Sequence, residues 1–173
     1  MKNLIITAAV VASFFALSFG RVNAQATATG HISAEVIEAL TVGESSSMNF
    51  GRFSAGDQGG SLIIPVKGAA VSTSTVTTAD SNINPATFSV SGSKNATFSV
   101  TLPQGPTTLT SISGEGTMMV TDWNASSLQG TDAYVLTGGT QTVSVGATLK
   151  VGTANENPTG IYTGSYQVTF AYN

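Results

Sequence analysis

The last fourteen residues of the chain, Gly160 to Asn173, alternate from Tyr162 onward between a mostly aromatic parity and a mostly polar one. One parity carries Tyr162, Tyr166, Val168, Phe170 and Tyr172, and the other carries Thr163, Ser165, Gln167, Thr169 and Ala171. Because successive side chains of a strand point to opposite faces, residues 160–172 are predicted to form a strand with one aromatic face and one Thr-rich, solvated face. At ~3.3 Å per residue it spans roughly 40 Å. Such a strand can line a core or offer an edge to a partner.

The first 24 residues have the pattern of a secretory signal peptide. Lys2 provides a positive start, residues 4–19 are apolar, and Val22-Asn23-Ala24 is a small-residue cleavage site. The apolar stretch is shorter than the ~20 residues that a bilayer span needs. The longest later apolar run is residues 62–66, so we expect an exported chain without a membrane span.

Composition narrows the class of protein further. The chain has no cysteine, so neither disulfides nor thiol chemistry can contribute. Only 9% of residues are charged, with nine acidic residues against six basic ones. A sparse, acidic surface argues against nucleic-acid binding and against anionic membranes. The expected class is a β-rich extracellular domain.

Short runs rich in Val, Ile, Thr and Phe alternate with Gly, Asn, Asp and Pro clusters along the rest of the chain. This pattern predicts an all-β sandwich of about 7–9 strands, with candidate strands at residues 61–67, 71–78, 86–91, 95–102, 116–123, 141–151 and 160–172. The similar segments 87–90 and 97–100 flank a Gly turn and are interpreted as a β-hairpin.

Residues 31–40 fit two periods. Ile32, Val36, Ala39 and Leu40 have helical spacing, whereas Ala26 to Val36 alternate as in a strand. The neighbouring Thr27 and Thr29 favour the strand.

A search for catalytic and metal-binding residues gives little. The single histidine, His31, is interpreted as a solvated surface residue, so we expect no catalytic triad, no enzyme activity and no cofactor. His or Cys metal sites are excluded by number. Residues 80–84 begin like a calcium loop, but Pro85 and Ser91 stand where Gly and Glu are needed. An Asx-rich turn is the better interpretation.

Trp123 is the one candidate for a ligand-binding aromatic side chain. Asp122, Asp132 and Tyr134 lie near it in sequence, and sugar-binding sites combine carboxylates with an exposed aromatic ring. A sole Trp in a sandwich is more often a core residue. Carbohydrate binding therefore stays a secondary hypothesis.

The closing residues also resemble a known family. Gly160 opens the last fourteen residues and Tyr172 is penultimate, which is similar to the C-terminal pattern of chaperone–usher pilins. Several further motifs, taken in order, resemble a bacterial family of secreted pilin-like domains of unknown function, similar to archaic pilins and spore coat protein U. They are Met48-Asn49-Phe50-Gly51, Gly59-Gly60-Ser61-Leu62, Pro85-Ala86-Thr87-Phe88, Val145-Gly146-Ala147-Thr148-Leu149 and Gly160-Ile161-Tyr162-Thr163-Gly164-Ser165-Tyr166.

This resemblance implies an immunoglobulin-like sandwich, residues 37–173, that lacks one strand. A neighbouring subunit's N-terminal extension, residues 25–36, would complete it by β-strand addition. The acceptor groove would be lined by Gly160, Tyr162, Tyr166, Val168, Phe170 and Tyr172, and the donor residues would be Ala26, Ala28, Gly30, Ile32, Ala34 and Val36. The resemblance further implies a homopolymer or mixed filament on the cell surface, with passage through the periplasm and possible help from a chaperone and an usher.

The donor departs from the usual pilin pattern because only Ile32 and Val36 are large. At about 1.5–3 kcal/mol per buried aliphatic side chain, the two supply some 3–6 kcal/mol. Two alternatives to a filament subunit therefore stay open. One is a monomer completed by its own N-terminal strand, and the other is an adhesive, carbohydrate-binding module that uses Trp123.

Overall fold

The computed structural model describes residues 25–73, 75–79, 82–127 and 134–173. The chain divides into two compact units, Met1–Glu35 and Val36–Asn173. The signal peptide predicted at residues 1–24 lies outside the described residues. Residues 25–35 are exposed and have no regular secondary structure.

Neither the strand nor the helix predicted for residues 31–40 is formed. A strand needs a neighbour for its N–H and C=O groups, and no other strand pairs with this segment in the described part of the chain. A helix of ten residues is marginal in water without packing. The alternating pattern is therefore present without the structure it predicts.

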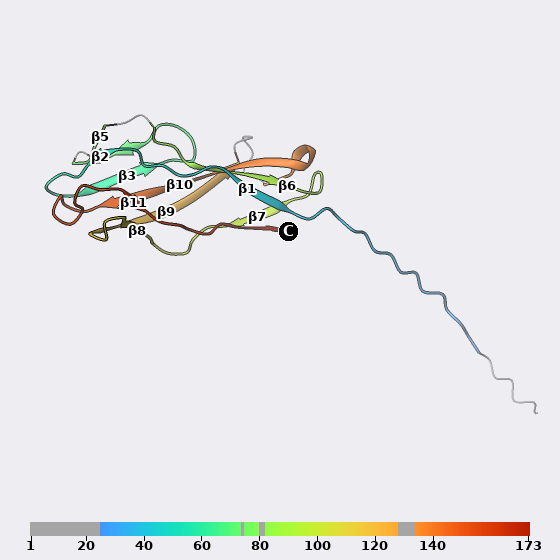
Figure 1. Cartoon of the computed structure of the whole chain (residues 1–173). Coiled ribbons are helices and arrows are strands. Elements are labelled where there is room, and N and C mark those ends of the chain that lie inside the picture. Colours follow the sequence, from blue (N-terminus) through green and yellow to red (C-terminus); the bar gives the residue numbers. More distant parts are fainter. Residues whose placement is uncertain (1–24, 74, 80–81, 128–133) are drawn as a thin grey trace, which may run out of the picture. The chain divides into compact units, whose positions relative to one another are not determined.

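The second unit is all-β, as predicted, and its strands pair in an antiparallel manner to build a sandwich-like fold (Figure 1). One short 3₁₀ helix is described, Thr137–Gly139. The strands are β1 (Thr41–Ser46), β2 (Phe53–Ser54), β3 (Gly60–Ile64), β4 (Val71–Ser72), β5 (Thr77–Thr78), β6 (Ala86–Ser91), β7 (Phe98–Thr101), β8 (Thr107–Ser111), β9 (Thr117–Ser127), β10 (Thr140–Val151), β11 (Tyr162–Thr163) and β12 (Thr169–Tyr172).

Strand β10 organises the main sheet, whose order is β1-β6-β10-β9-β8-β11. One edge of β10 pairs first with β6 and then with β3, and the other edge pairs with β9. Two smaller sheets consist of β12 with β7 and β2 with β5. Residues 141–149 of β10 are almost entirely buried on both parities, so both faces of this strand are covered.

The core consists of two apolar clusters. One is built around Leu62, Val120 and Leu149, and the other around Val90, Phe98 and Val145. Met48 and Trp123 pack against both. These two side chains therefore connect the halves of the sandwich.

The predicted hairpin of residues 87–90 and 97–100 is wrong. β6 pairs with β1 and β10, whereas β7 pairs with β12 in another sheet. Val90 and Phe98 nevertheless belong to the same core cluster. The two similar segments supply apolar faces to one core from different sheets, so their common pattern reflects burial and not pairing.

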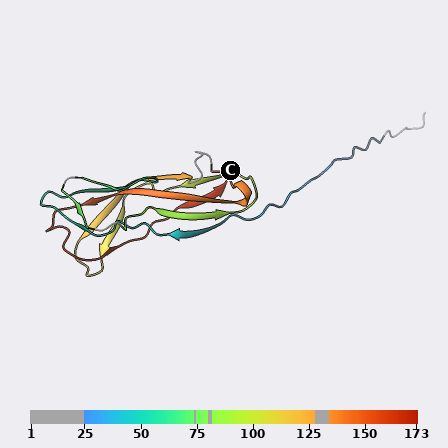
Figure 2. The same cartoon turned by 90° about the horizontal axis from the view of Figure 1, so that it is seen from above.

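The predicted C-terminal strand is divided. Tyr162–Thr163 forms β11 beside β8, Thr169–Tyr172 forms β12 beside β7, and residues 164–168 lie between them without a ladder (Figures 1 and 2). The alternation itself is present, because the tyrosines, Val168 and Phe170 are half-buried while the residues between them are exposed. The strand is interrupted because its ends belong to different sheets.

The packing around Phe98 predicts a large loss of stability for its truncation. Phe98 is 2% exposed, and its ring lies 6.2 Å from that of Phe170 and 5.4 Å from that of Tyr134. Phe98→Ala should lower the free energy of unfolding by about 3–5 kcal/mol in chemical denaturation. Ile112→Ala, at a site 68% exposed, is the control and should change it little. Equal effects for both variants would contradict the described core.

Candidate functional site

Two strand edges without a partner face the same hollow. Among the described strands, β1 pairs only with β6 and β12 only with β7, so each keeps one free edge. Val42 and Glu44 of β1 and Val168 and Phe170 near the C-terminus line a hollow of about 770 Å³. All six residues of β1 are exposed. The first and last strands of the domain are therefore the walls of an open site.

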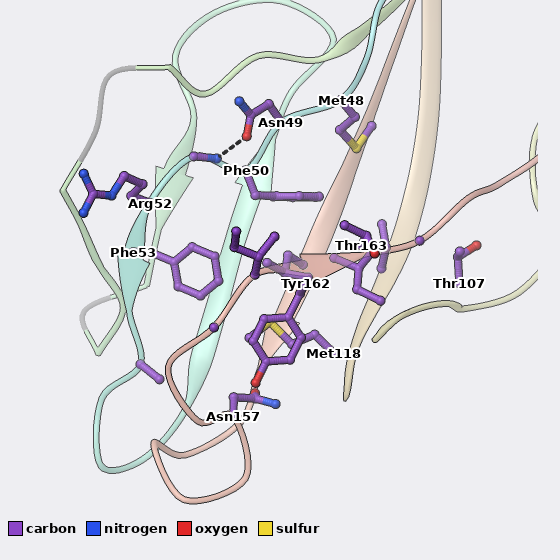
Figure 3. A pocket seen from close by; sticks show the side chains of 18 of the residues that line it. Met48, Asn49, Phe50, Arg52, Phe53, Thr107, Met118, Asn157, Tyr162 and Thr163 are labelled. Atoms are coloured by element: carbon purple, nitrogen blue, oxygen red, sulfur yellow. Dashed lines mark hydrogen bonds between the residues drawn. The ribbon is translucent and has the colours of Figure 1, made fainter. Parts of the chain in front are cut away.

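A larger hollow of about 1020 Å³ adjoins this one, since Met48, Gly164 and Tyr166 line both (Figure 3). Its walls come from residues 48–55 and 154–166. Its lining is mostly apolar and includes Phe50, Phe53, Leu109, Met118, Val120, Trp123, Leu149 and Tyr162. We call the two hollows together the groove, with one wall from residues 42–55 and the other from residues 160–170.

The wide end of the groove is the larger hollow, and the narrow end is the smaller one. Polar contacts hold both walls at the wide end. The backbone N–H of Gly51 donates to Asn49 Oδ1 at 2.8 Å (Figure 3). On the opposite wall, the hydroxyl of Tyr162 donates to the carbonyl of Pro158 at 2.8 Å, and the buried Asn157 donates to the carbonyl of Thr117 at 2.8 Å. These contacts fix the turn within the first wall and the loop that precedes the second wall.

An aromatic pair lies in the middle of the groove. The rings of Trp123 and Tyr166 are 4.6 Å apart and tilted by 34°. Trp123 Nε1 and the hydroxyl of Tyr166 are buried and have no hydrogen-bond partner in the described part of the chain. A buried polar group left unpaired costs about 1–3 kcal/mol, so these two atoms make the middle of the groove an energetically unfavourable part of the described structure.

The surroundings of Tyr166 also affect its ionisation. Burial raises the pKa of Tyr166 to about 12, and the nearby carboxylate of Glu44 adds to the increase. Both causes disfavour the phenolate. The Tyr166 hydroxyl therefore stays a donor over the whole physiological range.

The backbone beside this pair is unpaired. Residues 164–168 belong to no ladder and form no backbone hydrogen bond with another described residue. Backbone donors and acceptors at a free edge are a template for another strand. The groove thus combines an apolar floor with unpaired peptide groups along one wall.

Tyr172 lies at the narrow end of the groove and does not line it. Its hydroxyl accepts a hydrogen bond from the backbone N–H of Ser93 at 2.8 Å and donates to the carbonyl of Glu38 at 2.9 Å. The C-terminal segment is thereby attached to the residues that lead into β1. Of the residues predicted for the acceptor groove, Gly160, Tyr162, Tyr166, Val168 and Phe170 do line the two hollows.

The residues predicted for other chemistry lie apart from one another. His31 is exposed, and Asp122 is an exposed residue whose carboxylate lies 3.9 Å from Lys150 Nζ. Asp132, like Asp80 and Ser81 of the calcium-like loop, is outside the described residues. In the part of the chain that is described, no three His, Cys, Asp or Glu residues gather as a metal site. One face of Trp123 is covered by Tyr166, and the half-buried Trp123 also lines the larger hollow.

Sequence reasoning missed the second wall of the groove. β1 is a Thr/Ser/Gly/Glu segment without apolar alternation, and Met48 and Phe50 follow it as isolated apolar residues. Only the family resemblance draws attention to the motif Met48-Asn49-Phe50-Gly51. The spacing of Met48 and Phe50, two apolar residues at alternate positions, is the signal that could have indicated a wall.

Comparison with known proteins gives a family without an assigned role. Residues 40–172 match the family model described as a domain of unknown function, DUF4402. No curated protein and no solved structure matches the chain. Among the described residues, no helix is both long and apolar enough to cross a membrane.

The raised pKa of Tyr166 predicts a step in alkaline stability. Below pH 10 the hydroxyl is protonated in the folded and unfolded states, so it contributes no pH dependence there. Between pH 10 and about 12 the unfolded chain ionises first, and folding stability falls as the pH rises. Tyr166→Phe should therefore reduce the loss of stability across this window in denaturation experiments. A loss equal to that of the unmodified chain would contradict the burial of this hydroxyl.

Proposed function

The chain belongs to the DUF4402 family, and we propose that it is a non-enzymatic structural subunit of a secreted or cell-surface filament that assembles by β-strand addition. Residues 25–36 of one copy would fill the groove of the next copy. The observation that carries this proposal is the pair of free edges on one groove. A strand inserted between β1 and β12 would pair with both.

One added strand would supply partners for both free edges. Insertion would place the new strand between the β1 edge of the main sheet and the β12–β7 sheet, which gives both edges a partner. The peptide groups of residues 164–168 would then gain a ladder. At about 1 kcal/mol net per hydrogen bond, a ladder of several bonds is comparable to the apolar contribution of the donor side chains.

Residues 25–36 have the properties of an occupant. They form no regular structure, and Ile32 and Val36 are 100% and 97% exposed. From Ala26 to Val36 the segment has the same number of residues as the wall from Gly160 to Phe170, which spans roughly 36 Å when extended. Two exposed aliphatic side chains on an otherwise small-residue strand gain free energy only when another surface covers them.

The direction of the walls favours a second copy over self-completion. Glu38 meets Tyr172 at the narrow end, and residues 49–55 share the wide hollow with residues 154–164, so the two walls run in opposite directions. To enter its own groove, the extension would have to reverse within residues 36–40. This segment has no Gly, Pro, Asn or Asp, its Leu40 packs against the core, and its Glu38 carbonyl is bonded.

An extension that fills the next groove makes a head-to-tail contact, and such contacts do not close, so they produce fibres. Each subunit would offer one free groove at one end of a filament and one free extension at the other. The absence of cysteine fits an interface that depends on backbone ladders and side-chain burial.

The location and the helper proteins are part of the same proposal. The predicted signal peptide supports export, and assembly would take place at the cell surface after passage through the periplasm. An open apolar groove with free strand edges is prone to aggregation before assembly. A periplasmic chaperone and an usher are therefore proposed as transient partners.

Substitutions in the extension test this function without disturbing the domain. Ile32→Asp places a charge on the donor face, whereas Ser33→Asp places the same charge on the solvated face and is the matched control. Samples of the chain without residues 1–24 are run on SDS gels with and without boiling. We expect a heat-sensitive ladder from the unmodified chain and the control, and its loss in Ile32→Asp.

Removal of residues 25–36 should likewise abolish the ladder. A single monomer band from the unmodified chain under all conditions, with unchanged thermal stability after the removal, would contradict assembly by strand addition. A monomer band with a marked loss of stability after the removal would instead support completion by the chain's own extension.

A further inference from the structure

The sizes of the side chains on the groove wall and on the extension are complementary in one alignment. Along the wall, the positions that share the aromatic parity are Gly160, Tyr162, Gly164, Tyr166, Val168 and Phe170. Along the extension, the alternate positions are Ala26, Ala28, Gly30, Ile32, Ala34 and Val36. On the wall, two of these positions are glycines among larger residues, Gly160 and Gly164. On the extension, two positions are large among small residues, Ile32 and Val36. Each pair is four residues apart.

We infer that the extension of the neighbouring copy runs antiparallel to the C-terminal wall with Val36 facing Gly160 and Ile32 facing Gly164. This inference rests on the proposed function and specifies its register. In this alignment Gly30 faces Tyr166, while the alanines face Tyr162, Val168 and Phe170. Every large side chain is opposite a small one, which is the arrangement that fills space without overlap.

Other alignments give overlap and voids. In the parallel alignment of the same length, Ile32 faces Tyr166 and Val36 faces Phe170, while Gly30 faces Gly164. An antiparallel shift by two residues in either direction places Ile32 opposite Tyr166 or Tyr162. Because strand register changes in steps of two on a fixed face, these are the nearest competitors.

The structure explains why residue 164 of the wall is a glycine. A Cβ at this position would lie 2.6 Å from the carbonyl oxygen of Thr108 and 2.7 Å from Leu109 Cδ2. Only glycine fits there, and Leu109 lines the hollow beside it. Leu109 and the Thr108 carbonyl fill the space beside Gly164, so Ile32 of the incoming strand would pack against the apolar side chain of Leu109.

Gly30 has a matching role beside the aromatic pair. A glycine lets a backbone approach a neighbouring ring closely. In the inferred register this backbone passes Tyr166, whose hydroxyl is unpaired, as is Nε1 of Trp123. Both polar atoms are buried, so the close approach of Gly30 would be to the ring of Tyr166 and not to its hydroxyl.

The opposite face of the incoming strand fits as well. Thr27, Thr29, His31 and Ser33 would lie across from Thr169, Gln167, Ser165 and Thr163, which are all exposed. Facing Thr and Ser side chains stabilise neighbouring strands. The chain's own extension, turned back at residues 36–40, would enter parallel to this wall and would meet the mismatched sizes.

Paired cysteines test the register directly, because the chain has none of its own. Thr29→Cys with Gln167→Cys places one cysteine on each exposed, solvated face, away from the core. Facing residues of neighbouring strands have Cβ atoms about 4.5–5.5 Å apart, close to disulfide geometry. After mild oxidation, boiled samples on a non-reducing gel should show a covalent ladder that disappears with reductant.

Two control pairs define the alternatives. Thr29→Cys with Thr163→Cys reports the parallel alignment, and Thr29→Cys with Ser165→Cys reports a shift by two residues. A ladder from either control, equal to or stronger than that of the first pair, would overturn the inferred register and leave strand addition intact. Heat-sensitive assemblies without a covalent ladder from any pair would overturn it in the same way.

The proposed function fails by different results. A covalently closed monomer, which migrates faster than the reduced chain, would show that the extension fills its own groove. If the unmodified chain does not assemble at all, the proposed interface is contradicted, and the inferred register is contradicted with it.

Discussion

The unpaired edges of the first strand, β1, and the last strand, β12, are the constraint on which the rest of the molecule depends. Peptide groups need hydrogen-bond partners, and β1, β12 and residues 164–168 leave a row of them without one in the described structure. Apolar side chains beneath this row make the gap a groove, with Phe88 in the smaller hollow and Leu109 in the larger one. An extended peptide would supply partners for both the backbone groups and the apolar side chains, which is the basis of the proposed strand addition.

The remainder of the sandwich supports this gap. β10 is buried on both faces and joins β6, β3 and β9, so the main sheet is stable without a contribution from the C-terminal segment's middle part. Tyr172 attaches that segment at one end through Ser93 and Glu38. The rest of the domain does not depend on a strand in the groove, and in the proposed assembly the extension would become ordered only when it enters a groove.

Sequence periodicity predicted the fold class, because segments such as residues 86–91 and 141–151 alternate apolar and polar side chains as strands do. Pairing was harder to predict. The segments 87–90 and 97–100 share a pattern because they face one core, yet they lie in different sheets. The aromatic wall could be recognised from Tyr166, Val168 and Phe170, whereas β1 has no apolar alternation and its role follows only from its position beside β6. The strand predicted for residues 31–40 needs a partner strand, and the local sequence pattern does not show whether one is present.

Hydrogen exchange at the backbone amides of residues 164–168 tests the central claim most directly. The amides should exchange rapidly in Ile32→Asp, which cannot donate its strand, and should be strongly protected in assemblies of the unmodified chain. Protection of the β10 amides should be equal in both samples, since that strand is paired in either state. Rapid exchange of residues 164–168 in both samples would contradict the insertion of a strand beside this wall.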